Sequence, residues 1–199
     1  MTSPEIFTVG ELGLLKDVAG GILYGQPLKG GAAGGLAVGG VYYTAGSEEM
    51  TWFDPTTKQE QKQTLVTQQD VVGLLAYGRP VGKRLGVGAA VKVGRSALAE
   101  AKSAMAVAGD VGLWWQSPVA GLTVSGAAQN VGTSGAFLNT RETLPLAGSL
   151  GAAYTRGIAA DWVGTVGADA AYLVTESRMV GQAGLEVDWK SYGIFGGYR

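Results

Sequence analysis

Hydrophobic residues recur at every second position over long stretches of this chain. In residues 85–94 the alternate positions carry Leu, Val, Ala, Val and Val, and the positions between them carry mostly glycine and alanine. Residues 105–115 and 181–190 repeat the pattern, with one apolar set and one small or polar set. A period of two is typical of a β-strand whose two faces meet different surroundings. The pattern therefore predicts strands.

Weaker alternation extends this prediction along the chain. It runs through residues 36–43, 71–77, 120–130, 144–156 and 162–174. Strands of soluble domains average about 5–6 residues, whereas a tilted strand that crosses a bilayer needs about 9–11. The strongest alternating segments here are ten residues long or longer. We therefore predict an all-β fold, an antiparallel up-and-down transmembrane β-barrel of about 10–12 strands.

Turn and loop signals separate the alternating segments. Short turns are expected at residues 80–83, 117–118, 156–157, 176–177 and 190–191, and a longer polar segment spans 132–140. We expect one domain, residues 1–199, with residues 47–63 and 95–103 as longer loops. The second of these has enough helix propensity for a helical turn that caps the barrel mouth. Residues 47–55 mix acidic and aromatic side chains that could contact a partner, a lipid or a cation, but we favour an ordinary long loop.

Composition supports a curved sheet and excludes several chemistries. The chain has 34 glycines among 199 residues, no histidine, no cysteine and a net charge of −1. Small residues let strands curve, and a closed hydrogen-bond ladder offsets the backbone entropy of glycine. Without His and Cys there is no Ser-His-Asp triad, cysteine nucleophile, structural zinc site or disulfide. We expect no enzymatic activity, no catalytic residue, no cofactor, no metal and no nucleic-acid partner.

Charged residues within the strands are expected to face a lumen. A charge on the lipid face at the bilayer midplane costs about 2–4 kcal/mol for Arg or Lys. For Asp110 we expect a hydrogen bond or an ion pair, with Lys92 of the preceding strand as a candidate partner; a solvated lumen charge is the alternative. The lumen-facing candidates are Lys92, Asp110, Asp169, Glu186 and Asp188.

Aromatic residues lie near the ends of the alternating segments. Amphipathic rings at strand ends form the girdles at the two membrane interfaces of a barrel. The alternative is that they fill the core of a soluble β-sandwich. The predicted interface aromatics are Tyr42, Tyr77, Trp115, Tyr154, Trp162, Tyr172 and Trp189.

An ordered set of motifs resembles the PorV/PorQ outer-membrane proteins, which belong to the FadL-like superfamily of barrels. Residues 75–92, LAYGRPVGKRLGVGAAVK, resemble a hairpin of that family. The other matching motifs are AGDVGL at 108–113, QNVG at 129–132, ETLPL at 142–146 and GLE at 184–186. The resemblance covers about residues 70–199 and, more loosely, residues 19–46. It implies a barrel in the bacterial outer membrane, although residues 1–5 do not read as part of a signal peptide.

The resemblance implies two roles and does not choose between them. FadL-like barrels move hydrophobic compounds across the outer membrane, whereas PorV-like members are non-enzymatic partners in protein secretion. We expect a barrel that contacts membrane lipid and binds or passes hydrophobic small molecules. The alternative is a structural or partner-binding barrel of a secretion or envelope complex. A soluble, adhesin-like all-β domain is a third hypothesis.

Overall fold

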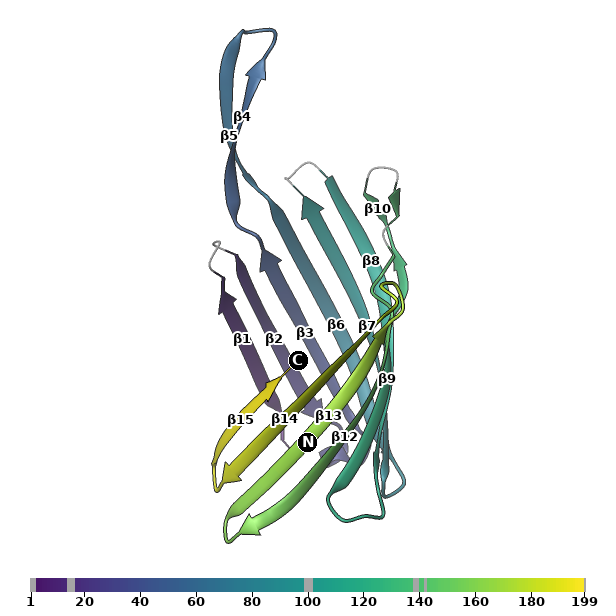
Figure 1. The fold of residues 1–199 in the computed structure, drawn as a ribbon. Helices are drawn as coiled ribbons and strands as arrows, with labels where there is room; N and C mark the ends of the chain where they lie inside the picture. The colour runs from purple at the N-terminus through teal and green to yellow at the C-terminus, as the bar shows by residue number, and fades with distance from the viewer. Residues whose placement is uncertain (1–2, 14–16, 99–101, 138–139, 142, 199) are drawn as a thin grey trace.

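The fold is a single large antiparallel sheet with two hairpins that extend from it (Figure 1). The structure is a computed structural model that describes residues 3–13, 17–98, 102–137, 140–141 and 143–198. Its elements are β1 (Glu5–Leu12), β2 (Val18–Pro27), the 3-10 helix η1 (Lys29–Gly31), β3 (Gly35–Thr44), β4 (Ser47–Asp54), β5 (Gln59–Val66), β6 (Gln68–Val81), β7 (Leu85–Leu98), β8 (Lys102–Gln116), β9 (Leu122–Ser134), β10 (Ala136–Phe137), β11 (Thr140–Arg141), β12 (Ala147–Ala159), β13 (Trp162–Leu173), β14 (Arg178–Trp189) and β15 (Tyr192–Tyr198).

Eleven strands of the described chain form the main sheet in the order β1-β2-β3-β6-β7-β8-β9-β12-β13-β14-β15. Each neighbour along this order is also the next main-sheet strand in sequence, and every pair is antiparallel. This confirms the all-β, antiparallel, up-and-down prediction, and the main sheet has a strand number within the predicted range. The connectivity is that of a meander, in which each main-sheet strand pairs with the main-sheet strand that precedes it in sequence.

The sheet curls strongly but does not close. Figure 1 shows β13, β14 and β15 crossing in front of the strands at the other end of the sheet. Among the described residues, β1 pairs only with β2, and β15 pairs only with β14. The expectation of a closed barrel therefore differs from the structure. The alternation of residues within a strand indicates which side chains share a face of the sheet. Closure depends instead on how the first and last strands meet.

One expected loop and one expected turn are wrong, and a second expected loop is strand at both of its ends. Residues 47–63 contain β4 and most of β5, which pair as a separate hairpin. The segment 95–103 continues β7 to Leu98 and begins β8 at Lys102, and its middle, 99–101, lies outside the described residues. The expected turn at 156–157 lies inside β12, and the chain turns instead at Asp161, whose φ is +64°. Asp tolerates this left-handed backbone better than most residues.

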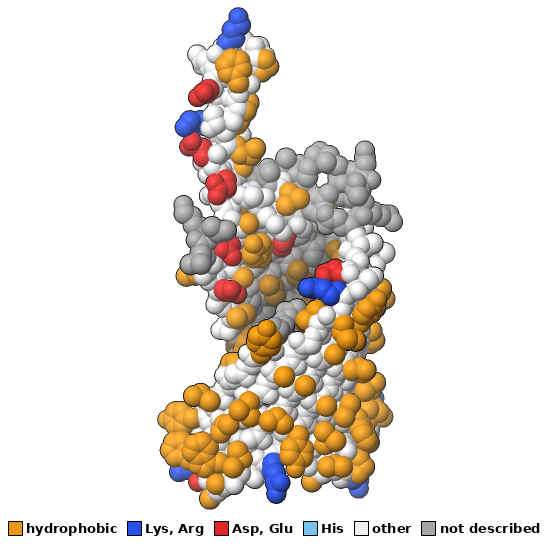
Figure 2. All heavy atoms as spheres, in the orientation of Figure 1, with side chains coloured by type: hydrophobic (Ala, Val, Ile, Leu, Met, Phe, Trp, Pro, Cys, Tyr) orange, Lys and Arg blue, Asp and Glu red, His pale blue; other side chains and the backbone are white. Residues whose placement is uncertain are grey.

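The two faces of the sheet carry different side chains. The register places Val91, Val111 and Leu150 on one face, which is convex, and Lys92, Asp110 and Gly151 on the other, which is concave. Convex residues are highly exposed; Val111, for example, keeps 57% of its surface. Figure 2 shows hydrophobic side chains spread over the outer surface of β12–β14. Among the described residues, only Ala108 and Ala147 are buried apolar side chains.

A sheet without a second layer has no conventional core. A soluble β-sandwich buries one face of each sheet against the other. The described strands form one large sheet, two short hairpins and nothing that packs across the convex face. Side chains of Val, Leu, Ile and aromatic type on this face therefore remain open to the surroundings, and contiguous apolar surface of this kind marks an interaction site.

Candidate functional site

The concave face forms two hollows lined mainly by small residues. The first, of about 780 Å³, runs across β3 and β6–β9 and is bordered by Asp110 and Trp114. The second, of about 880 Å³, lies across β12–β15 and is bordered by Asp169, Glu186 and Phe195. Glycine, alanine and serine make up much of both linings, and side chains of this size leave the hollows open.

Trp114 is a large aromatic side chain in the lining of the first hollow. A Cβ on Gly86 would lie 2.0 Å from Nε1 of Trp114, so the indole lies directly over this glycine on the neighbouring strand. Trp115, the next residue, points to the convex face because successive side chains of a strand alternate. The two adjacent tryptophans therefore lie on opposite faces of the sheet.

All five charged candidates lie on the concave face. The register relates Asp110 to Ala90 across β7–β8, Asp169 to Gly151 across β12–β13, and Glu186 to Thr165 across β13–β14. Residues paired in this way project to the same side of an antiparallel sheet. Lys92 and Asp188 share this side by their positions two residues from paired concave residues.

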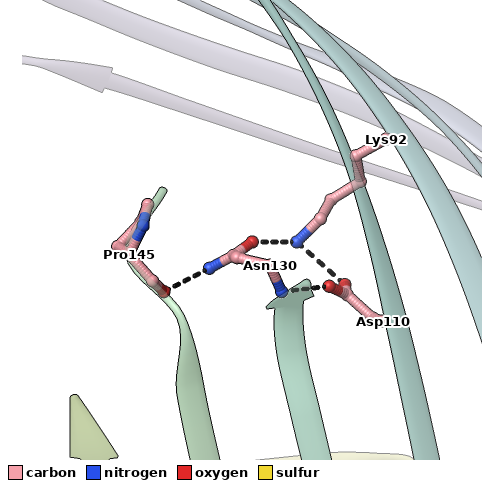
Figure 3. A network of polar contacts seen from close by, with 4 residues as sticks. All are labelled: Lys92, Asp110, Asn130 and Pro145. Carbon is pink, nitrogen blue, oxygen red and sulfur yellow. Dashed lines mark hydrogen bonds and ion pairs between the residues drawn. The ribbon is translucent and has the colours of Figure 1, made fainter. Parts of the chain in front are cut away.

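Lys92 and Asp110 form the predicted ion pair at the centre of a polar network (Figure 3). Lys92 Nζ lies 2.8 Å from Asp110 Oδ2 and donates to Asn130 Oδ1 at 2.5 Å. The Asn130 amide donates through Nδ2 to the carbonyl oxygen of Pro145 at 2.9 Å. The network thus joins β7, β8 and β9 to the segment that leads into β12.

Asn130 belongs to a β-bulge that the sequence analysis did not assign. Between the pairs Gly109–Val131 and Val111–Ala128, β8 contributes one residue and β9 contributes two. Asn130 has a φ of +61°, and its backbone N–H donates to Asp110 Oδ1 at 2.8 Å. An extra residue in one strand bends the strand and is found where a side chain must be redirected. The Asn-Val-Gly motif was the available signal, because Asn tolerates the left-handed backbone.

The other concave acids are separated from this network. Asp169 Oδ2 accepts from Gln182 Nε2 at 2.8 Å, an interaction across β13–β14. Asp188 leans over Gly193, where an added Cβ would lie 2.6 Å from its Oδ1 and 3.9 Å from Glu186 Oε1. The structure therefore brings two candidates together as an ion pair and gathers two others, both acidic, near β15.

The predicted interface aromatics all lie on the convex face and fall into two rows. Five are near the end of the sheet that holds the β6–β7, β8–β9, β12–β13 and β14–β15 turns, and two are near the opposite end. The first row is Tyr77, Trp115, Tyr154, Trp162 and Trp189; the second is Tyr42 and Tyr172. Trp162 stacks on Trp189 with 6.0 Å between ring centroids, and Trp189 stacks on Tyr192 at 6.2 Å.

The β4–β5 hairpin stands apart from the sheet at the end opposite the larger aromatic row (Figures 1 and 2). Its exposed side chains include Met50, Trp52 and Phe53. At its tip Asp54 Oδ1 accepts from the backbone N–H of Thr56 at 2.8 Å. This hydrogen bond, which favours the ionised carboxylate, lowers the pKa of Asp54.

The ion pair of the network is expected to contribute more to stability than the exposed pair of the hairpin. Lys92 and Asp110 keep 23% and 22% of their side-chain surface, against 61% and 58% for Lys62 and Glu49. We expect Lys92→Met to lower the free energy of unfolding by roughly 1–2 kcal/mol, because it leaves a half-buried carboxylate without its cation. Lys62→Met should cost about 0–0.5 kcal/mol. Urea unfolding of both variants tests this, and equal losses would contradict it.

Within the described residues, no three side chains of His, Cys, Asp or Glu type are grouped to hold a metal ion. The helical part of the described chain includes no segment long and apolar enough to cross a membrane. Comparison with protein-family models gives no match, and no curated protein matches the sequence. The resemblance to the PorV/PorQ proteins therefore depends on the motifs themselves.

Proposed function

We propose that this chain forms the wall of a bacterial outer-membrane β-barrel that binds or passes hydrophobic small molecules along its concave face. The observation that carries the proposal is the exposed apolar convex face of the sheet, over which no second layer of the described residues packs. Lipid is the surrounding in which such a face is stable, since hydrocarbon chains cover it without a protein partner.

Strand length and aromatic placement support the same proposal. Strands β6, β7, β8 and β9 have 14, 14, 15 and 13 residues, which is enough to cross a hydrocarbon core at a tilt. The two rows of convex aromatics lie toward opposite ends of the strands, as interfacial girdles do. The short turns beside the larger row correspond to the periplasmic side, and the β4–β5 hairpin to the outside.

The concave face supports the hydrophobic-ligand part of the proposal. The first hollow is lined mainly by glycine, alanine and apolar side chains, with the ring of Trp114 among them. Two charged residues, Arg79 and Asp110, also line it, and Asp110 is neutralised by Lys92. An apolar lining with few convergent polar groups is typical of small-molecule sites. Neutral or amphiphilic apolar compounds would contact this lining without separating the Lys92–Asp110 ion pair.

The adjacent tryptophans provide a direct test of the membrane and ligand proposals. We expect phospholipids with brominated chains to quench Trp115 strongly and Trp114 weakly after reconstitution, because only Trp115 lies on the convex face. The test uses Trp114→Phe and Trp115→Phe variants in a background whose remaining tryptophans, Trp52, Trp162 and Trp189, are phenylalanine. Equal quenching of both, or a chain that stays folded and monodisperse without detergent, would overturn the membrane proposal.

A neutral brominated hydrocarbon tests the ligand proposal in the same two variants. Binding in the first hollow should give saturable quenching of Trp114 at concentrations that leave Trp115 emission unchanged. If quenching instead rises linearly and equally in both variants, the compound only partitions into the bilayer. That outcome would remove the ligand proposal and leave the membrane proposal standing.

The β4–β5 hairpin favours a second candidate function, a partner-binding barrel of a secretion or envelope complex. A two-stranded hairpin in water is marginally stable alone, and this one exposes apolar and acidic side chains on both faces. Replacement of residues 47–66 by a short turn separates the two functions. Loss of a stoichiometric partner from envelope extracts, with Trp114 quenching unchanged, would favour the second candidate.

A further inference from the structure

Four basic residues gather at the end of the sheet that holds the β6–β7 and β8–β9 turns. Lys29 lies in the connection between β2 and β3, Arg79 lies near the end of β6, and Lys83 and Arg84 lie in the β6–β7 turn. These segments are neighbours, because β3 pairs with β6 and β6 pairs with β7. All four residues are exposed. We call them the basic rim.

No acidic residue offsets the charge of the basic rim. Residues 28–35, 76–91 and 112–126, which make up the β2–β3, β6–β7 and β8–β9 connections and the strand ends beside them, contain no Asp or Glu. None of the four basic residues has an ion-pair partner among the described residues. The β4–β5 hairpin, at the opposite end of β3 and β6, has four acidic residues and two lysines within 47–66 (Figure 2). The two ends of these strands therefore differ in the sign of their charge.

Arg79 joins the basic rim to the larger row of convex aromatics. Arg79 borders the first hollow, but it follows Tyr77 by two residues on β6, so its side chain projects from the convex face as that of Tyr77 does. The Tyr77 hydroxyl donates to the carbonyl oxygen of Ala33 at 2.8 Å. A Cβ on Gly34 would lie 2.8 Å from Cβ of Arg79. The connection that carries Lys29 therefore packs against β6 beside Arg79.

A basic side chain beside an interfacial aromatic row is placed to reach lipid phosphate. Aromatic rings at a membrane interface lie at the level of the lipid headgroups. Arginine binds phosphate oxygens through two parallel hydrogen bonds, and each basic residue near an anionic membrane surface strengthens binding about fivefold. A protein partner in water would contact Lys83 and Arg84 in the turn, whereas Arg79 lies next to the aromatic row. The position of Arg79 therefore favours lipid.

We propose that the basic rim binds the phosphate groups of anionic phospholipids, so that this end of the sheet selects anionic over zwitterionic lipid. Arg79 contacts the headgroups from the convex face, and Lys29, Lys83 and Arg84 contact them from the connections. The proposal rests on the proposed membrane function and adds which lipid contacts one part of the convex face. A second copy of this chain in the same orientation fits less well, because it would set one basic rim beside another.

Brominated lipids measure this selectivity at Trp115, which lies on the convex face and pairs with Leu85, the residue after Arg84. The test uses the full chain with Trp115 as its only tryptophan, in phosphatidylcholine vesicles that contain a minor fraction of either brominated phosphatidylglycerol or brominated phosphatidylcholine. We expect the anionic lipid to associate at least threefold more strongly, as calculated from the quenching. This preference should fall at least twofold between about 0.1 M and about 1 M salt, since the Debye length shortens from about 10 Å to about 3 Å.

Neutral substitutions in the basic rim should remove the preference. In Arg79→Gln/Lys83→Gln/Arg84→Gln we expect the association constants of the two lipids to agree within about twofold, because a single basic residue of the rim remains. Quenching by brominated phosphatidylcholine, measured on the same variant, shows whether it is folded in the bilayer. The charge-preserving variant Arg79→Lys/Arg84→Lys should keep at least half of the preference. Complete loss in that variant would mean that the two arginines act through packing, which would overturn the proposal.

The matched control removes the same charge from the opposite end of the sheet. Lys58→Gln/Lys62→Gln/Arg178→Gln should leave the preference of Trp115 for anionic lipid unchanged, because these residues lie in the β4–β5 hairpin and at the start of β14. An equal loss in this control would show that the preference follows the net charge of the whole chain and not the basic rim, and would overturn the proposal.

The remaining outcomes separate this proposal from the membrane proposal. Quenching of Trp115 by brominated phosphatidylcholine without a preference for the anionic lipid would retain the membrane function and overturn the lipid selectivity. No quenching by either lipid would remove both. Labelled polyglutamate, followed by fluorescence anisotropy, tests an acidic protein segment as the occupant. If the chain binds this peptide, shows no lipid preference, and loses peptide binding in the rim variant, the basic rim is a protein-binding site and the lipid proposal is overturned.

Discussion

Gly132→Ala is expected to lower the free energy of unfolding by about 2–3 kcal/mol, a typical cost of forcing extra atoms into closely packed surroundings. A Cβ at residue 132 would lie 2.0 Å from the carbonyl oxygen of Val107 and 2.7 Å from Cα of Ala108. Both contacts are with backbone, so no side-chain rotation relieves them. The strands β8 and β9 must separate, immediately beside the bulge at Asn130. Urea titration of protein refolded in detergent measures the loss.

Gly148→Ala is the matched control for this substitution. Gly148 also lies within a main-sheet strand, β12, but no heavy atom lies within 4 Å of the position that a Cβ would take. Alanine in an unobstructed strand position is about 0.5–1 kcal/mol more favourable than glycine. The two glycine-to-alanine changes should therefore have opposite signs. A loss at Gly148 equal to that at Gly132 would show that strand glycines are needed for a general reason and not for the close approach of β9 to β8.

The positions of the main strands were predictable because their two faces differ. Residues 85–94, 105–115 and 181–190 alternate clearly, and each lies within a single strand of the sheet, except that β14 ends at Trp189, one residue before the end of the third segment. The same alternation identified which charged and aromatic residues share a face. The two-residue period of hydrophobic positions predicts both the strands and their faces, because the side-chain direction in a strand repeats every two residues.

Segments whose two faces have similar surroundings were not predictable in this way. The β4–β5 hairpin is exposed on both sides, so polar and apolar residues follow no period in it. The β1 strand was missed because it lies at an edge, where both faces and one side are open. The bulge at Asn130 depends on how β8 pairs with β9, and the open edges depend on how the first and last strands lie. The two-residue period of a single strand indicates neither.

Val111→Arg is the substitution that best separates a lipid-facing surface from one that faces water. Val111 lies near the middle of β8 on the convex face and is more than half exposed. In a bilayer, arginine near the midplane should destabilise the folded protein by about 2–4 kcal/mol, because its charge must be held in hydrocarbon or drawn to the interface. In water an exposed valine-to-arginine change is within about 0.5 kcal/mol. Folding into lipid vesicles, followed by guanidinium titration, measures the difference.

Ser125→Arg provides the control on the opposite face. Ser125 is exposed on the concave side, where it pairs with Trp114 of β8, and an arginine there can extend into the open hollow. We expect a change within about 0.5 kcal/mol, the usual range for surface substitutions. A large loss at Val111 with little change at Ser125 requires hydrocarbon on the convex side alone. If both variants fold into vesicles as well as the unaltered chain, the convex face does not contact lipid, and its apolar residues must be covered by protein.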